Sequence, residues 1–312
     1  MKKIWTTQDI PSQLGRRVLI TGANSGIGFH TALELARQGA EVILPARTVA
    51  KSNDAIARIR TEVPNAKLIP ETLDLADLNN VRTFAARIID RFPGQSLDLL
   101  INNAGVMAVP TRELTVDGYE RQFATNFLGP FALTALLYNS VKQRPGSRIV
   151  IVSSSISNYG KIDFSNLQGE RRYSPMNQAY AQSKLADSIF ALELHRRLTA
   201  IGSPIIVTAA HPGYAITNLQ SAGPGDGFSL LRIISSILKP IASQSAAAGA
   251  LPTLLAATEP TAEPGGYYGP DRMMELKGDP VSVPIAKAAQ DPVTAQRLWS
   301  VAEQLTGVTF DI

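Results

Sequence analysis

The stretch Arg17-Val-Leu-Ile-Thr-Gly-Ala-Asn-Ser-Gly-Ile-Gly28 decides the fold of this chain. Residues 17–21 form a short apolar run with β-branched side chains, which is typical of a buried strand. The glycine turn follows at once, and residues 29–38 have the composition and spacing of a helix. A strand, a glycine-rich turn and a helix in this order are the context of a dinucleotide-binding site.

The glycines of this turn have separate physical roles. Gly22 permits a tight turn, Gly26 lets the backbone approach a pyrophosphate, and Gly28 lets the helix pack close to the strand. The free amide groups at the start of the helix would face the phosphates. The alternative is a C-capping glycine turn without a ligand. The predicted cofactor contacts of this turn are Gly22, Asn24, Ser25, Gly26, Ile27 and Gly28.

Strand-like and helix-like runs alternate along the whole chain. The strand candidates are residues 17–21, 41–46, 67–72, 97–102, 147–153, 204–210 and 266–268. This alternation predicts the α/β class, with one Rossmann-type, doubly wound parallel sheet of about seven strands and helices on both faces. Ligands of such sheets bind beyond the carboxyl ends of the strands.

Length and composition predict one catalytic domain over residues 1–312, because 45% of the residues are hydrophobic and only 18% are charged. The net charge of +4 is spread along the chain, which argues against a nucleic-acid partner. There is no cysteine, and the three histidines have no metal-ligand spacing, so no metal is expected. No apolar run approaches the roughly 20 residues of a membrane span. A soluble, cytoplasmic protein without an integral membrane segment is expected.

Tyr180-Ala-Gln-Ser-Lys184 places a phenol and an ammonium four residues apart, on one face of a predicted helix. A free phenol has a pKa of about 10. The nearby ammonium favours the phenolate and so prepares Tyr180 for proton exchange. The pair alone is more typical of a solvated surface than of an active site. Together with the glycine turn and Ser154, it predicts an acid–base site.

These motifs occur in the order expected of a short-chain dehydrogenase/reductase, and the chain resembles that family over roughly residues 15 to 270. The motifs are Thr21 to Gly28, Asn102-Asn-Ala-Gly105, Asn126, Ser154, Tyr180-x-x-x-Lys184 and Pro212-Gly213. Residues 162–168, 210–214 and 267–270 indicate a nearer likeness to the subgroup of retinol dehydrogenases, protochlorophyllide reductase and the oxidoreductase with WW domains.

The resemblance implies a catalytic set. Tyr180 would be the acid/base, and Ser154, the second of three consecutive serines, would polarise the reacting oxygen. Lys184 would bind the ribose hydroxyls and lower the pKa of Tyr180. Asn126 would organise a water in a proton relay. The implied activity is the interconversion of an alcohol with an aldehyde or ketone. Reduction of a carbon–carbon double bond and a non-catalytic dinucleotide sensor are the alternatives.

The end of the second strand candidate indicates NADP(H) as the cofactor. Ala46 stands where family members that use NAD tend to carry an aspartate, and Arg47 follows. A guanidinium can pair with a 2′-phosphate through two charge-assisted hydrogen bonds. A solvent-exposed arginine without a ligand is the alternative. The resemblance adds cofactor contacts at Asp74, Leu75, Asn102, Ala104, Gly105, Tyr180, Lys184, Pro212, Gly213 and Thr217.

Two segments depart from the shorter members of the family. Residues 158–176 form a polar, turn-rich insertion, expected as a surface excursion at the rim of the site. The usual subunit contact of the family uses the helix that bears Tyr180. The insertion puts this contact in doubt, so the resemblance leaves open whether the protein forms a homo-oligomer. Residues 215–245 are expected to form a helical lid, with apolar residues at helical spacing over 230–241. A subunit contact and a membrane-surface helix are the alternatives for 230–241, and the lid predicts a lipophilic substrate.

Overall fold

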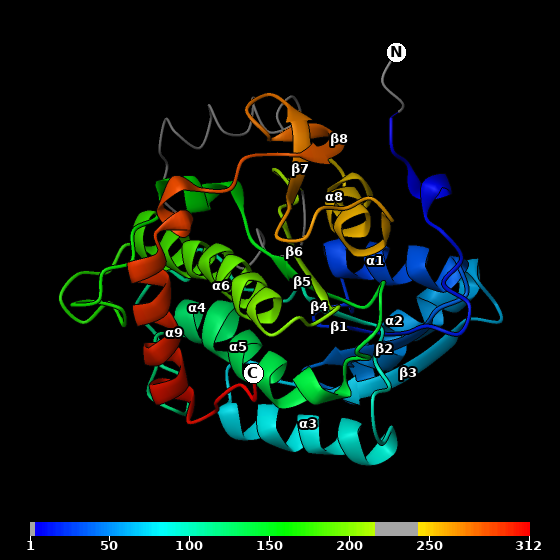
Figure 1. Ribbon diagram of the computed structural model, residues 1–312, viewed down its shortest axis with the longest axis horizontal. Coiled ribbons are helices and arrows are strands. Elements are labelled where there is room, and N and C mark those ends of the chain that lie inside the picture. Colours follow the sequence, from blue (N-terminus) through cyan, green and yellow to red (C-terminus); the bar gives the residue numbers. More distant parts are fainter. Residues whose placement is uncertain (1–3, 216–242) are drawn as a thin grey trace.

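The strand candidates form one sheet in the computed structural model, which describes residues 4–215 and 243–312 (Figure 1). The order of the strands in space is β3-β2-β1-β4-β5-β6-β7-β8. The first seven are parallel, and β8 pairs antiparallel with β7. The strands are β1 (Arg17–Ile20), β2 (Glu41–Ala46), β3 (Lys67–Thr72), β4 (Leu99–Asn102), β5 (Arg148–Val152), β6 (Ile206–Ala210), β7 (Tyr267–Arg272) and β8 (Lys277–Ser282).

The predicted doubly wound sheet is confirmed, but the expected number of about seven strands is corrected to eight within the described ranges. The sequence Lys277-Gly-Asp-Pro-Val-Ser282 has no apolar run. It can nevertheless form a strand because β8 lies at the edge of the sheet, where a proline such as Pro280 is tolerated.

The strand order reverses between β1 and β4. The chain proceeds from β1 to β2 and β3 on one side, and it returns to β4 and β5 on the other. Val18 is in register with Leu99 across this boundary. The carboxyl ends of β1 and β4 therefore border a topological switch point, where open sheets of this kind bind their ligands.

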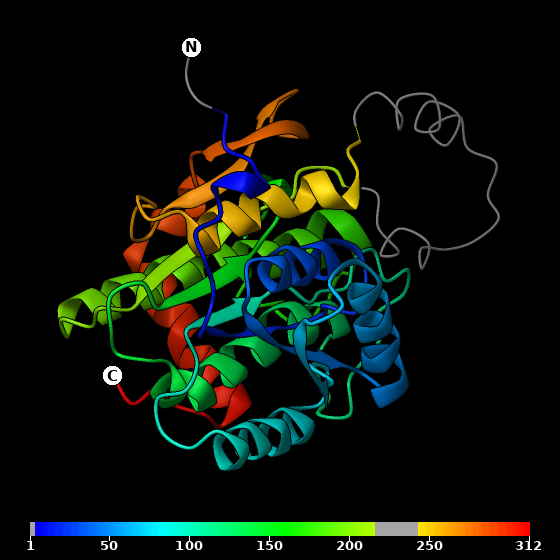
Figure 2. The same cartoon turned by 90° about the vertical axis from the view of Figure 1, so that its right-hand side faces the viewer.

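Helices cover both faces of the sheet, as predicted (Figures 1 and 2). On one face the apolar core joins the sheet to α1, α2 and α8. On the other it joins the sheet to α3, α5, α6 and α9. The bounds are α1 (Gly26–Arg37), α2 (Val49–Glu62), α3 (Leu78–Arg91), α4 (Arg121–Phe123), α5 (Gly129–Leu137), α6 (Ala181–Ala200), α8 (Ala246–Thr258) and α9 (Pro292–Thr306).

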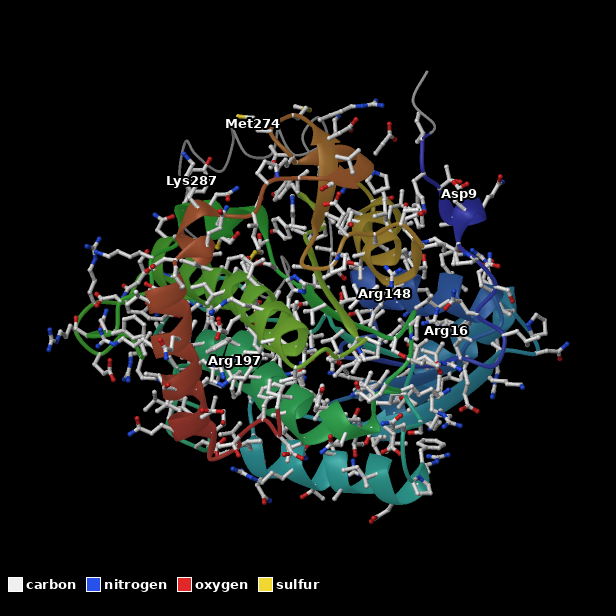
Figure 3. All side chains as sticks on the ribbon, in the orientation of Figure 1. Asp9, Arg16, Arg148, Arg197, Met274 and Lys287 are labelled. Atoms are coloured by element: carbon white, nitrogen blue, oxygen red, sulfur yellow. The ribbon has the colours of Figure 1, made fainter. Side chains whose placement is uncertain are left out.

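Arg148, labelled in Figure 3, is a buried cation that ties α8 to the sheet. It donates hydrogen bonds to the carbonyl oxygens of Ala256 (2.8 Å) and Glu259 (2.5 Å) at the end of α8. A positive charge is favoured there because the last carbonyls of a helix have no partner within it. Burial, and then Arg16, lower the pKa of Arg148 to about 10, so the guanidinium stays charged at neutral pH.

The insertion at residues 158–176 has exposed residues at the surface and is also anchored to the rest of the protein. Ile162 and Asn166 are buried, whereas residues 170–172 are exposed. Buried Gln182 of α6 accepts a hydrogen bond from the amide of Asp163 (2.9 Å) and donates one to the carbonyl of Leu167 (3.1 Å). Phe164 and Leu167 also pack against the apolar core, so both hydrogen bonds and apolar contacts hold the segment.

Asp98→Asn should lower the free energy of unfolding by about 1.5–3 kcal/mol at neutral pH, because Asp98 is a buried anion with charged partners. Its side chain has no exposed surface, and it pairs with Lys142 (2.8 Å) and Arg144 (2.5 Å). Burial would raise the pKa of Asp98, but Lys142, the Arg17 amide and Arg144 outweigh burial and hold it below its usual value.

The stability from Asp98 is present above its unfolded pKa, and it is lost as the pH falls through its lower folded pKa. Urea unfolding at neutral pH and below about pH 4 measures this contribution. A cost that is equal at both pH values would contradict the ionic origin.

Candidate active site

The glycine turn is shaped by contact with the end of β4. The Thr21 hydroxyl oxygen accepts hydrogen bonds from the amides of Asn103 and Ala104, both at 3.0 Å. Gly22 has a φ of +68°, which side chains disfavour. A Cβ atom on Gly28 would lie 2.4 Å from Nδ2 of Asn103 and 2.5 Å from the Gly22 carbonyl oxygen. Only glycine fits at this position.

The start of α1 keeps its amide groups free of side-chain caps. Its N-cap residue, Ser25, makes no capping hydrogen bond. By contrast, the first turns of α2, α3, α8 and α9 are capped by Thr48, Asp77, Ser245 and Asp291. Asn24, Ser25, Gly26 and Ile27 are all half-buried, so this turn reaches the surface. An uncapped helix start behind a glycine turn is suited to bind a phosphate.

Arg47 lies at the carboxyl end of β2, directly after buried Ala46, and is exposed. Within the described ranges it forms no salt bridge. Asp74, after β3, is half-buried, and one of its carboxylate oxygens accepts a hydrogen bond from the Ala76 amide (3.0 Å). Leu75 is buried in the core, and its carbonyl oxygen packs against Gly129 of α5.

Asn102 and Asn126 are held by the protein itself. Asn102 is buried and donates to the Thr134 hydroxyl of α5 (2.9 Å). Asn126 lies in a π-helical turn, η2 (Ala124–Leu128). Its Oδ1 accepts from the Val106 amide (2.7 Å), and its Nδ2 donates to the Val106 carbonyl and to Ser183 Oγ, both at 2.9 Å. The Asn126 side chain therefore fixes the loop after Gly105.

The three consecutive serines have different surroundings. Ser153 is buried, and its hydroxyl donates to the Lys184 carbonyl oxygen (2.7 Å) and contacts Ser188 Oγ (2.9 Å). Ser154 is half-buried and begins the 3₁₀ turn η4 (Ser155–Tyr159), where its Oγ accepts a long hydrogen bond of 3.4 Å from the Ile156 amide. Ser154 thus keeps a hydroxyl that can donate to a ligand.

Tyr180 and Lys184 meet at the start of α6. Tyr180 is the last residue of a second π-helical turn, η5 (Pro175–Tyr180), and 7% of its surface is exposed. Lys184 is buried, and its Nζ donates to the Val152 carbonyl oxygen (2.9 Å) at the end of β5. A Cβ atom on Gly105 would lie 3.1 Å from Asn126 Oδ1 and 3.5 Å from Lys184 Nζ. The ends of β4 and β5 therefore bring Gly105, Asn126 and Lys184 together.

Asp187 is the member of this cluster that the sequence analysis missed. Its Oδ2 accepts a hydrogen bond from Lys184 Nζ at 2.8 Å, and both side chains are buried. The sequence contained a signal for this pair: Lys184 and Asp187 are three residues apart, and residues at this spacing lie on the same face of a helix.

Pro212 and Gly213 form the loop after β6. Gly213 has a φ of +61°, and the Tyr214 amide donates to the Leu276 carbonyl oxygen (2.7 Å). Gly249 of α8 packs against this loop and against α1, because a Cβ atom there would lie 3.4 Å from both the Pro212 carbonyl oxygen and Ile27. Thr217 and residues 216–242 of the expected lid over 215–245 lie outside the described residues.

The remaining chemistry of the described residues is limited. They contain no group of three or more His, Asp or Glu side chains that could hold a metal ion. None of the helices within these ranges is both long enough and apolar enough to cross a bilayer.

Comparison with known proteins gives one consistent result. Residues 16–224 match the model of the short chain dehydrogenase family. The chain is 41% identical to human retinol dehydrogenase 13. The matched region covers 94% of this chain and 85% of that protein. An uncharacterised protein from Mycobacterium paratuberculosis, whose crystal structure is known, is 39% identical in sequence to this chain. The two structures align with a TM-score of 0.81 over 99% of this chain and all of that chain.

A short chain dehydrogenase from Burkholderia cenocepacia J2315, solved in complex with NADP, is 26% identical to this chain. Its TM-score is 0.63, over 82% of this chain and 96% of that chain.

Proposed function

The chain belongs to the short-chain dehydrogenase family, and from that premise we propose that it is an NADP(H)-dependent oxidoreductase that interconverts a lipophilic alcohol with its aldehyde or ketone. The observation that carries the proposal is that Asn126 and Lys184 meet beside Gly105, at the carboxyl ends of β4 and β5, with Tyr180 one helical turn before Lys184. This cluster borders the switch point where the glycine turn also lies.

The residues present fit a dinucleotide. The uncapped first turn of α1 offers amide donors to a pyrophosphate, and the missing Cβ of Gly28 keeps the turn close to the helix. Asp74 would contact the adenine, and the loop at Pro212 and Gly213 would contact the nicotinamide half. The half-buried surface of residues 103–106 lies between these two ends of the site.

The preference for NADP(H) rests on Arg47. Its guanidinium is exposed at the strand end, and buried Ala46 stands where a carboxylate would repel a 2′-phosphate. The bound NADP in the similar Burkholderia cenocepacia dehydrogenase supports the same choice. Arg47 is therefore proposed to pair with the 2′-phosphate.

Arg47→Ala should weaken NADPH binding by about tenfold to a hundredfold, since losing a hydrogen bond to a charged group costs roughly 1.5–3 kcal/mol. NADH binding should change little, because NADH has no 2′-phosphate. Fluorescence titration of both cofactors gives the two affinities. Arg37→Ala is the control, because Arg37 is another exposed arginine, lies at the end of α1 far from the glycine turn, and pairs with Glu34 and Glu62. Equal losses for NADPH and NADH would contradict the role of Arg47.

The side chains perform the proton chemistry. When bound, the nicotinamide supplies the hydride in the reductive direction. Tyr180 gives its phenolic proton to the substrate oxygen, and Ser154 donates a hydrogen bond to that oxygen as negative charge develops on it. Lys184 holds its ammonium beside Tyr180 and favours the phenolate that remains. Because both ends of the Asn126 amide are hydrogen-bonded to Val106, a relay water would bind at the Asn126 main chain.

The proposed substrate class is lipophilic, which the relative named retinol dehydrogenase supports. NADPH oxidation with a series of aldehydes and ketones of increasing chain length tests it. We expect kcat/KM to rise with chain length, and product analysis should show an alcohol rather than a reduced double bond. A preference for small polar carbonyls would contradict the lipophilic substrate. NADPH binding without turnover of any carbonyl would contradict the enzymatic proposal.

A further inference from the structure

Lys184 and Asp187 form a buried ion pair inside α6. The exposed fractions of their side chains are 5% and 1%, and Nζ lies 2.8 Å from Oδ2. Lys184 Nζ makes a second hydrogen bond, to the Val152 carbonyl oxygen. An ammonium has three protons, so one donor remains for a ligand. The other Asp187 oxygen, Oδ1, has no hydrogen-bond partner among the described residues.

The ammonium needs this partner because it is buried. Burial lowers the pKa of a lysine by disfavouring its charged form. In this chain the carboxylate of Asp187, and then Tyr180, outweigh burial, and the pKa of Lys184 lies above its ordinary value. Burial raises the pKa of Asp187 to about 7, while Lys184 opposes that rise. The pair is therefore charged on both sides above about pH 7, and it loses its anion as the pH falls through that value.

Three further titratable side chains, Tyr267, His211 and Glu275, lie on the β7 side of the pair. Tyr267 of β7 is buried, and burial, with smaller contributions from Glu275 and Asp187, raises its pKa. The centroid of its ring lies 5.2 Å from that of the His211 ring, with the two planes tilted by 39°, and His211 Nε2 lies 3.0 Å from Glu275. Ser153 and Ser188 contact the Lys184 carbonyl oxygen. Lys184 is the cation that Asp187 contacts in the described part of the chain.

We propose that Asp187 is a positioning residue of the reaction, which holds the Lys184 ammonium in place and keeps it charged where a lone ammonium would give up its proton. This inference rests on the proposed function of Lys184 toward the cofactor ribose. Asp187 acts only through Lys184, since its own carboxylate is enclosed by the protein. The positive charge of Lys184 beside Tyr180 therefore depends on the ionisation of the Asp187 carboxyl.

The test is the NADPH dissociation constant of the parent and of Asp187→Asn, measured by fluorescence titration from about pH 6 to about pH 9. Asparagine keeps the size of the side chain and removes its charge. At about pH 9 the variant should bind NADPH about tenfold more weakly, because a neutral amine makes weaker hydrogen bonds than an ammonium. At about pH 6 the parent's own carboxyl is protonated, so the two constants should converge.

Two further variants sharpen the comparison. Asp187→Glu keeps the charge and should restore most of the affinity at about pH 9. Asp98→Asn is the matched control: it removes another buried, ion-paired carboxylate, at the opposite ends of the strands, and should leave the NADPH constants at their parent values. If Asp187→Asn does not accumulate as a folded protein, Asp187→Ser makes the same comparison with a smaller side chain.

A ratio of constants that stays the same at every pH would overturn the proposal, because a purely structural Asp187 would weaken binding uniformly. Asp187→Glu behaving like Asp187→Asn would overturn it as well. Cofactor binding separates this inference from the proposed function. A parent that binds NADPH but reduces no carbonyl would contradict the proposed function, and the binding curves would still decide the role of Asp187.

Discussion

Tyr180→Phe is expected to reduce NADPH-dependent carbonyl reduction by about 10²–10⁴-fold, the usual contribution of a general acid. The variant removes only the phenolic oxygen, and the ring keeps its packing at the start of α6, where Tyr180 is 7% exposed. Folding and NADPH affinity should therefore stay close to those of the parent. Steady-state turnover, a thermal melt and a cofactor titration measure the three quantities.

Tyr119→Phe is the matched control for this substitution. It also removes one phenol, whose hydroxyl donates to the Leu305 carbonyl oxygen at 2.7 Å in a contact between distant parts of the chain. This control should lose some stability and keep its turnover number. Near-parental turnover in Tyr180→Phe would exclude Tyr180 as the proton donor.

Lys184→Ala should be comparably damaging to turnover, and it should also destabilise the fold. Removing one partner of a buried ion pair costs about 3–5 kcal/mol, because the other charge is left unpaired. Lys184 lowers the pKa of Asp187, so in the variant that pKa should rise above its parent value of about 7. A folded pKa above the unfolded value favours the folded state at low pH, so the destabilisation should grow as the pH rises. Urea unfolding at about pH 6 and about pH 8 measures it.

The double variant Lys184→Ala/Asp187→Ala tests whether this cost comes from the orphaned carboxylate. Removing both charges should cost less stability at about pH 8 than removing Lys184 alone.

Residual turnover of Lys184→Ala should shift to higher pH, because the phenolate has lost its nearby cation. A pH profile that superimposes on the parent's would contradict the electrostatic role of Lys184.

The central strands were predictable because they are buried on both faces and therefore read as apolar runs, such as Arg148-Ile-Val-Ile-Val152. The edge strand β8 was not, because one side of it faces no other strand among the described residues, and its own residues need not be apolar. The glycine turn was predictable from the spacing of its glycines within eight residues, whereas its hydrogen bonds with Asn103 and Ala104 were not.

Contacts between distant segments were not predictable. Asn126 binds Val106, and Lys184 binds the Val152 carbonyl, only because the fold brings their elements together. Asp187 differs, because it is local to α6, but a carboxylate next to a helical lysine is usually a solvated pair, and only its burial marks it as unusual.

The two π-helical turns have a consequence for how such sites can diverge. Asn126 lies within one of them and Tyr180 ends the other. Each π-helical turn holds more residues than an α-helical turn, and each residue of an α-helix advances the side-chain direction by about 100°. Loss of a single residue upstream of Tyr180 could thus relax the turn into regular helix while rotating the phenol out of the site. Length variation, ordinarily harmless in loops, would be disabling in these two helices even if every motif residue were retained.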